Sequence, residues 1–459
     1  MIQATLGNGE LTDDQIVFII NKFSQSRFTQ NEAYFYGDNT AIFTANTKDR
    51  ESITPNNKIP VPFARKIALT TKNYLFAKDP IYHADDSGYL EELNRVFRYN
   101  WNQSKISSVG EGLVVHGTAY KLFYAEQVGG SLVPCYTIVS PTQMIPVYSE
   151  DIEPVLIAGI RFYVRTDIVT SETKTHVEVY YAEKVVKFIK HPSSLTGREE
   201  APNLFNAVPL VVYGGEDLQG VFEPVKEIID AIDKVISSDV NEIERFEALY
   251  MILIGDKLPE NPADVEKMVR RRIFELSENA QMSYLERHID ADFNMQLLDR
   301  LINLVHKMSG VPDFDSPEFA AESGVALQYK LMGFENVAAQ YEAAFIKGEH
   351  ESIALINALL YDQPDAFAFE TANPARTVSI ELQRNMPEDV KARLEEAKLM
   401  KDLEVSTETV FSYLPMIENP GDEREKVENE KKENFDRYQK TAFSQLTQQP
   451  EEEEEIVKQ

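Results

Sequence analysis

The strongest hydrophobic pattern in the chain lies between residues 223 and 253. Apolar residues recur there at intervals that place them on one arc of a helix, at Val225, Ile228, Ile229, Ile232, Val235, Ile236, Ile243, Phe246 and Tyr250. Glu223, Glu227 and Asp230 fall on the opposite arc. The pattern predicts a helix of about 45 Å, at about 1.5 Å per residue. Asp239 lies inside the apolar arc, so it must find a partner, contact another subunit or mark a bend.

A second amphipathic helix is predicted for residues 293–308, with apolar positions at Leu297, Leu298, Leu301, Ile302 and Val305. Between the two helices, Gly255, Pro259 and Pro262 end the first pattern. A short helix at residues 263–272 ends in Arg270, Arg271 and Arg272, and residues 273–285 have the composition of strands. The three arginines could bind an acidic partner or simply end a helix.

An acidic loop with two prolines follows the second helix, at residues 311–323. It consists of Val311, Pro312, Asp313, Phe314, Asp315, Ser316, Pro317, Glu318 and Phe319, then two alanines, Glu322 and Ser323. The loop holds four carboxylates and no cation, and the chain is helical again from Val325. The prolines limit its freedom, and the phenylalanines can pack it against its surroundings. Composition leaves two interpretations open: an ordinary solvated turn, or a loop that needs its negative charge.

The segments before the long helices predict an α+β region. Residues 1–56 combine an apolar helix at 15–23 with a polar stretch, and residues 57–220 contain two helices, one within 59–77 and one at 91–101. Strands rich in β-branched and aromatic residues follow at 118–125, 133–139, 155–164 and 176–181. Their spacing by turns predicts a small antiparallel sheet.

The C-terminal part is predicted to be helical. A helix begins near residue 386 with Pro387 at its first position, and Ser406 and Thr407 can cap another that stops before Pro415. Residues 421–446 are charged and amphipathic, and five consecutive glutamates at 451–455 predict a disordered tail. The fold class expected from the whole pattern is α+β and mainly helical.

Composition and charge narrow the class of protein. The 459 residues are 43% hydrophobic, which is enough for a sizeable core, and the formal net charge is −29. That charge argues against a protein that wraps nucleic acid with a basic face, but allows one that stays near nucleic acid without adhering to it. The single cysteine, Cys135, fits a reducing compartment and a core position. We see no signal peptide or membrane-spanning stretch, and expect a soluble protein.

No catalytic constellation is recognisable in the sequence. The P-loop, G-x-S-x-G and H-E-x-x-H patterns are all missing. His83 with Asp85 and Asp86 is the nearest approach to a metal cluster, and a polar loop explains it better. His116 follows Val115 and fits a structural histidine. We therefore expect no catalysis, no cofactor and no metal site.

Several short blocks occur in one order along the chain. The strongest is IDAIDKVISSDVNEIERF at residues 229–246, and the next combines Pro312, Asp313 and Phe314 with SGVAL at 323–327. Weaker blocks lie at 57–59, 74–80, 117–124, 140–141, 145–148, 160–163, 406–409 and 414–415. In this order they resemble the portal proteins of tailed bacteriophages, specifically those of long non-contractile-tailed phages of Gram-positive hosts. The resemblance covers about residues 55–430, and Ala77 departs from it, because the family commonly has glycine there.

The resemblance implies a ring-forming fold with a wing, a two-helix stem, a clip and a helical crown. It makes residues 1–56 an N-terminal segment, 57–220 the wing, 221–254 and 292–310 the stem helices, and 255–291 the clip. Residues 311–323 correspond to the tunnel loop, 324–385 to a long helix and the remainder of the wing, 386–447 to the crown, and 448–459 to an acidic disordered tail.

The function that the resemblance implies is a ring, usually a dodecamer, at the capsid vertex of the virion, through which double-stranded DNA is packaged and ejected. The implied partners are the large terminase, the major capsid and scaffold proteins and a head-completion adaptor. Assembly would take place in the host cytoplasm, without a membrane. The terminase would dock on the clip, where Arg270, Arg271 and Arg272 lie. The acidic tunnel loop and an acidic stem face of Glu223, Glu227 and Asp230 would repel phosphates, so that DNA could slide without a deep binding well.

Two other functions remain open. A monomeric helical adaptor or scaffold protein would bury the apolar arc of residues 225–250 within one chain, whereas a ring would bury part of it between subunits. A nuclease or hydrolase with a carboxylate-bound metal would need clustered aspartate, glutamate or histidine at strand ends, and we find no such cluster in the sequence.

Overall fold

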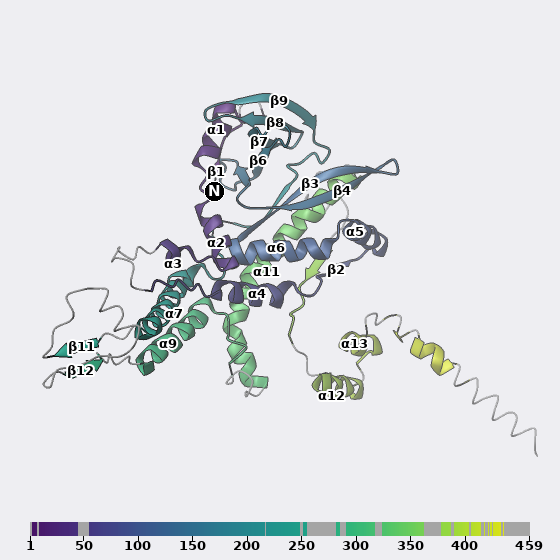
Figure 1. Cartoon of the computed structure of the whole chain (residues 1–459). Coiled ribbons are helices and arrows are strands. Elements are labelled where there is room, and N and C mark those ends of the chain that lie inside the picture. The colour runs from purple at the N-terminus through teal and green to yellow at the C-terminus, as the bar shows by residue number, and fades with distance from the viewer. Residues whose placement is uncertain are drawn as a thin grey trace, which may run out of the picture. The chain divides into compact units, whose positions relative to one another are not determined.

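The computed structural model describes residues 2–6, 9–44, 55–215, 217–247, 251–254, 281–284, 291–316, 324–361, 378–386, 390–403 and 405–414, and in addition 417, 421, 423–424, 426–432 and 435. The chain divides into two compact units, Met1–Asn385 and Met386–Gln459. In the first unit, a layer of helices lies beside two β-sheets, and a pair of long helices extends from that layer (Figure 1).

The helices of the first unit begin and end at residues with clear local signals. Their bounds are α1 Asp13–Lys22, α2 Ser26–Tyr36, α3 Thr40–Thr44, α4 Phe63–Phe76, α5 Ser87–Tyr99, α6 Asn102–His116 and α11 Gly324–Tyr361. Thr12 and Gln15 form a capping box on α1, and Asp86 caps α5 by accepting from two backbone N–H groups. Gly117 ends α6 at φ 74°, where a Cβ atom would lie 1.9 Å from the Leu218 carbonyl oxygen.

The strands of the first unit form two main sheets. Their bounds are β1 Ile2–Gln3, β2 Ile81–Ala84, β3 Thr118–Val128, β4 Ser131–Val139, β5 Met144–Tyr148, β6 Leu156–Thr166, β7 Thr173–Tyr180, β8 Lys184–Lys190, β9 Leu195–Pro202 and β10 Leu210–Gly214. The six-stranded sheet has the order β1-β5-β6-β7-β8-β9, and the three-stranded sheet has the order β10-β3-β4. The predicted strands are confirmed as antiparallel neighbours, but they are shared between two sheets, and β1 pairs with β5 in parallel.

The hydrophobic core lies where the helices cover the sheets. Ile16 and Ile19 of α1 pack with buried residues of β5 to β8, among them Ile160 and Val179. On the other sheet, Phe345 of α11 is fully buried, and α11 and α6 both contact β3. The cores therefore tie the N-terminal helix and the long helix α11 to the sheets.

The first predicted long helix is shorter than the sequence pattern indicated. Helix α7 spans Lys226–Glu247 and follows a 3₁₀ turn, η1, at Glu223–Val225, where Pro224 favours a helix start. The prediction of helix up to residue 253 is wrong, because β11, Met251–Ile254, pairs antiparallel with β12, Gln281–Tyr284. A run of four aliphatic residues fits a strand as well as a helix turn, and the partner strand decides between them.

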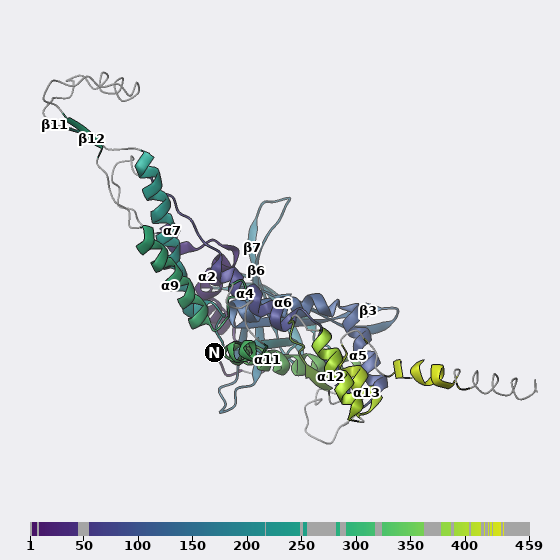
Figure 2. The same ribbon diagram turned by 90° about the horizontal axis from the view of Figure 1, so that it is seen from below.

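The second amphipathic helix is confirmed as α9, Ala291–Ser309, and it lies beside α7 in both views (Figures 1 and 2). The strand predicted within residues 273–285 is confirmed for β12. A strand that the sequence reasoning missed, β13 Val378–Glu381, pairs antiparallel with β2.

The helix predicted within residues 59–77 is confirmed as α4, which begins at Phe63. Pro60 and Pro62 keep the residues before them out of the helical region. Residues 57–61 are instead extended, and α7 accepts their backbone N–H groups.

The described part of the second unit includes the helices α12 Val390–Asp402 and α13 Thr407–Ser412. Ser406 caps α13 as predicted, because its hydroxyl accepts from the backbone N–H of Thr409 at 3.2 Å. The described residues between 421 and 435 are helical, in agreement with the amphipathic pattern there. Pro387, Pro415 and the glutamate run at 451–455 lie outside the described residues.

Candidate functional site

The pair α7 and α9, with the turn that follows α9, is the region that carried the strongest sequence signals. Ile229 and Ile232 of α7 and Val305 of α9 are fully buried along this pair. Asp239, the polar residue within the apolar arc, accepts a hydrogen bond from Asn294 Nδ2 of α9 at 2.7 Å. Of the three alternatives expected for Asp239, the structure shows a partner within the chain, and the bond links the two helices.

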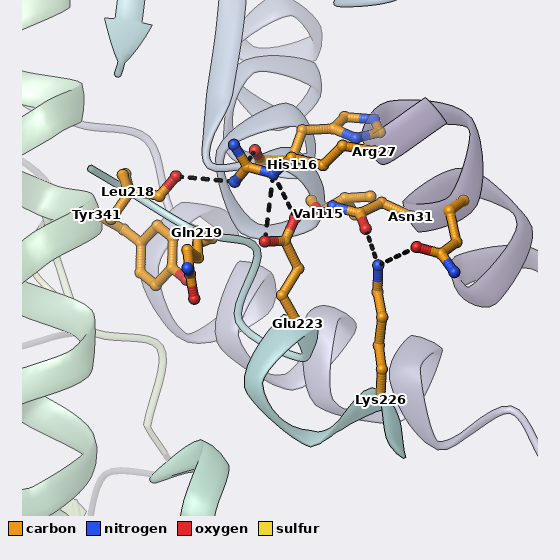
Figure 3. Close-up of polar contacts among 10 residues, drawn as sticks. Arg27, Asn31, Val115, His116, Leu218, Gln219, Glu223, Lys226 and Tyr341 are labelled. Carbon is orange, nitrogen blue, oxygen red and sulfur yellow. Dashed lines mark hydrogen bonds and ion pairs between the residues drawn. The ribbon is translucent and has the colours of Figure 1, made fainter. Parts of the chain in front are cut away.

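The base of α7 is tied to helix α2 (Figure 3). Arg27 Nε donates to Glu223 Oε1 at 3.0 Å, while Arg27 Nη2 donates to the carbonyl oxygens of His116 at 3.3 Å and Leu218 at 3.2 Å. Asn31, which is fully buried, donates to the same Glu223 carboxylate and to a backbone carbonyl at the end of α6. One arginine thus joins α2, the end of α6 and the start of α7.

Further contacts close this network on both sides. Lys226 Nζ donates to Gln30 Oε1 at 3.3 Å and to the side-chain oxygen of Asn31. On the other side, the Tyr341 hydroxyl of α11 donates to the Gln219 carbonyl oxygen at 2.8 Å (Figure 3). The segment that leads into α7, from Leu218 to Lys226, is therefore held by α2, α6 and α11.

This network corrects part of the predicted acidic stem face. Glu223 lies in η1 rather than in the helix, and its half-buried carboxylate is neutralised by Arg27. Asp230 is also half-buried and accepts from the Tyr34 hydroxyl at 2.6 Å. Only Glu227 of the three has an exposed side chain, so Glu223 and Asp230 do not belong to a solvated acidic face.

A polar ladder on α7 holds the extended residues 57–61. Val61 N donates to Asp233 Oδ1 at 2.8 Å, Ile59 N to Ser237 Oγ at 2.9 Å, and Asn57 N to Asn241 Oδ1 at 2.6 Å. The spacings match, because four residues of helix rise about 6 Å and two residues of extended chain rise about 6.6 Å. Asp233 is fully buried, and burial raises its pKa against the opposing effect of its bonds from Asn39 and Val61.

The turn after α9 begins with a fixed conformation. Gly310 ends the helix at φ 71°, a left-handed value that suits glycine. The next residue, Val311, is buried, and its carbonyl oxygen lies 2.9 Å from His306 Nδ1, while its N–H donates to Ser309 Oγ at 3.3 Å. The start of the predicted tunnel loop is therefore anchored to the end of α9.

A lysine from α4 pairs with the acidic residues of this turn. Lys66 Nζ lies 3.0 Å from Asp313 Oδ1 and 3.0 Å from Asp315 Oδ2. Burial alone would raise the pKa of Asp313, but the hydrogen bond and charge of Lys66, aided by His306, lower it below its ordinary value. Burial alone would lower the pKa of Lys66, but Asp315 and Asp313 raise it. The turn therefore carries one net negative charge and not two.

The remaining predicted site residues fall into two groups. Phe314 packs edge-to-face with Phe334 of α11 at 6.2 Å between ring centroids, Pro312 is half-buried, and Ser316 N donates to the Asp313 carbonyl oxygen at 3.3 Å. The other group, which consists of Pro317, Glu318, Phe319, Glu322, Arg270, Arg271 and Arg272, lies outside the described residues.

Sequence reasoning missed Lys66 and Arg27, which contact the acidic residues of the candidate site. Lys66 is 247 positions from Asp313, and Arg27 is 196 positions from Glu223. Neither cation has a local pattern that points to its partner. Both cations occur in predicted helices or beside them, where a charged residue is common and gives no sign of a distant partner.

The other candidate chemistry resolves into structural roles. Asp86 caps α5, and within the described ranges no three histidine, cysteine, aspartate or glutamate residues are grouped as a metal site. Burial, with the charges of Arg27 and Lys226, lowers the pKa of His116 to about 4, so this histidine is neutral at pH 7. Cys135 is buried as predicted, and burial raises the pKa of its thiol to about 11. Among the helices that can be described, none is long and apolar enough to cross a membrane.

The chain matches a known protein family over most of its length. A family model described as phage portal protein, SPP1 Gp6-like, matches residues 17–436. The chain belongs to the phage portal protein family. The resemblance inferred from the sequence is thereby confirmed, as is the α+β fold class.

The chain is also similar to the following two proteins. The portal protein of Clostridium phage phiCD119 is 21% identical over 376 residues, a match that covers 77% of this chain and 82% of the relative. Among solved structures, a chain from the "Neck of empty GTA particle computed with C6 symmetry" is 12% identical with a TM-score of 0.45, covering 77% of this chain and 90% of that one. Portal proteins are structural, and membership of the family implies a place at the capsid vertex of the virion.

Proposed function

We propose that this portal protein forms the ring at the capsid vertex through which genomic DNA is packaged and later ejected. The observation that carries the proposal is the helix pair α7 and α9, ending in an acidic turn that Lys66 and a buried Val311 hold in place. In this proposal α7 and α9 form the stem, residues 255–291 the clip, residues 311–323 the tunnel loop, and the unit from Met386 the crown.

Exposure of the apolar arc favours a ring over a monomeric adaptor. Ile243 belongs to the apolar arc of α7, yet in the single chain its side chain is 62% exposed. Met295 and Met308 of α9 are exposed as well. Exposed apolar side chains on two neighbouring helices favour a partner surface, and adjacent copies of the stem would supply it.

The charge of the turn suits DNA that must slide. Lysines facing phosphates would release counterions and bind DNA with a strongly salt-dependent affinity. Here Lys66, which lies beside the described part of the turn, is paired with two aspartates, and the side chain of Asp315 remains 81% exposed. A net negative turn can approach DNA without creating a deep binding well, which is the property that passage requires.

The partners follow from the same proposal. The large terminase would dock on the clip, where Arg270, Arg271 and Arg272 supply positive charge. The major capsid and scaffold proteins would contact the wing during assembly in the host cytoplasm, and a head-completion adaptor would replace the terminase after packaging.

The proposal predicts that cognate capsids made without this chain contain no packaged genome. Capsid, scaffold and terminase proteins would be expressed with and without the chain, and the DNA that resists nuclease digestion would be measured in purified particles. Particles made with the chain should protect genome-length DNA. Equal protection in its absence would contradict the proposed function.

A further inference from the structure

Each helix of the pair α7 and α9 carries a row of side chains that faces solvent. From the base of the pair outward, the α7 row consists of Glu227, Ala231, Lys234 and Ser238. In the same direction, the α9 row consists of Lys307, Asn303, Asp299 and Gln296. All of these residues are exposed except Ala231, which is half-buried. Because residues three or four positions apart lie on one face of a helix, each set forms a continuous row.

The hydrogen bond between Asp239 and Asn294 relates the heights of the two rows. The helices run side by side (Figures 1 and 2), and α9 ends beside η1, where α7 starts, so they are antiparallel. Lys234 and Asp299 each lie five positions from the bonded pair, which is about 7.5 Å toward the base at about 1.5 Å per residue. Glu227 and Lys307 lie twelve and thirteen positions away, at about 18 and 20 Å. At both heights, a carboxylate in one row matches a lysine in the other.

The charged side chains of the two rows are not neutralised by their own chain. Within the described part of the chain, the side chains of Glu227, Lys234, Asp299 and Lys307 form no ion pair and no hydrogen bond. The next carboxylate along α7, Glu242, differs because it is half-buried and already has a contact within the chain. Arg300 lies to one side of the α9 row, about 100° around the helix from Asp299.

We propose that in the ring the α7 row of one subunit packs against the α9 row of the next, pairing Glu227 with Lys307 and Lys234 with Asp299. This inference rests on the proposed function, in which α7 and α9 form the stem and run along the channel. A closed ring needs two different complementary surfaces on each subunit, and the two rows are such a pair. Rotation about the ring axis places equal heights of adjacent subunits side by side, so each carboxylate meets a lysine.

The rest of the two rows fits the same register. The uncharged residues also meet at equal heights: Ala231 with Asn303, and Ser238 with Gln296. The α9 row lines a hollow of about 420 Å³, and the small side chains of the α7 row allow the neighbouring helix to approach it. Exposed ion pairs add little affinity individually, so their main effect is to select the register. A slip of one helical turn, about 5.4 Å, would set charged residues opposite uncharged ones and lose both pairs.

Cross-linking of the full-length protein tests this interface. A variant with both Glu227→Cys and Lys307→Cys is treated with a short bismaleimide, which spans the gap left by the two long side chains. Each chain should then be linked to both neighbours, giving a ladder of covalent multimers up to the size of the ring, whereas either single variant should give none. The matched control combines Glu227→Cys with Met308→Cys, which moves one cysteine about 100° around α9 to another exposed position and should give several-fold fewer multimers. The native Cys135 gives little background because it is buried.

Charge reversal gives a second readout in the same protein. Lys307→Glu should lower the fraction of chains in rings several-fold at low salt, and adding Glu227→Lys should restore it. Lys187→Glu makes the same change in net charge at an exposed position of β8 and should have no effect. Rings that give no multimers above the control, or that are not restored by the double reversal, would overturn this interface and leave the proposed function standing. Absence of rings in the unmodified protein, both alone and with scaffold protein, would count against both.

Discussion

Replacing Lys121 by methionine is expected to lower the free energy of unfolding by about 3–5 kcal/mol. Lys121 of β3 and Glu349 of α11 are both fully buried, and their charged atoms lie 2.5 Å apart. Glu349 also accepts from the Tyr213 hydroxyl at 2.6 Å, and Lys121 donates to Ser352 Oγ at 3.1 Å. Burial lowers the pKa of Lys121 against the opposing effect of Glu349. Without the lysine, a buried carboxylate loses its counter-charge.

The measurement is urea unfolding at a fixed subunit concentration, since assembly itself stabilises the folded chain. The control is Lys187→Met, at an exposed position of β8, which should change stability by less than about 0.5 kcal/mol. Adding Glu349→Gln to Lys121→Met should recover part of the loss, because neither buried group is then charged. A Lys121→Met protein within about 1 kcal/mol of the wild type would show that this pair is not enclosed as described.

Replacing Asp315 by lysine is expected to leave rings intact and to hinder DNA passage. The substitution puts a new cation beside Lys66, whose two carboxylate partners are reduced to Asp313. Asp315 is the better position of the two, because Asp313 also accepts from the backbone N–H of Asp315 and its loss would disturb the turn itself. If about six such lysines reach phosphates, DNA affinity should change about a thousandfold between 50 and 200 mM salt.

Packaged DNA that resists nuclease is measured at two salt concentrations, and the defect should ease at the higher one. Asp315→Asn removes the charge without adding a cation and should have a smaller effect. Asp151→Lys makes the same change at an exposed turn between β5 and β6 and should have none. Unchanged packaging by Asp315→Lys would contradict the view that the turn favours sliding through its negative charge.

The helices of the candidate site could be predicted because their signals are local. The 3.6-residue period of apolar residues located α7 and α9. The polar Asp239 within the apolar arc indicated that a partner could be needed, and Asn294 is that partner. The end of α7 could not be predicted, because Met251–Ile254 is decided by pairing with a strand some 30 positions away.

The charged partners of the site depend on contacts that no local pattern encodes. The sequence shows a loop without a cation, but the fold brings Lys66 to it from a helix 247 positions earlier. In the same way, the helical pattern of polar and apolar residues suggested an acidic face on α7. In the structure, Arg27 and Tyr34 of α2 bind two of its three carboxylates. Electrostatic roles inferred from one helix therefore change once neighbouring helices are placed.

The central claim is that this portal protein assembles into a ring with a channel. The most direct test is the mass of the purified full-length protein in solution, combined with negative-stain images of the same sample and repeated in the presence of scaffold protein. The account predicts a homogeneous ring of about twelve subunits with an axial hole. A stable monomer, both alone and with scaffold, would contradict it.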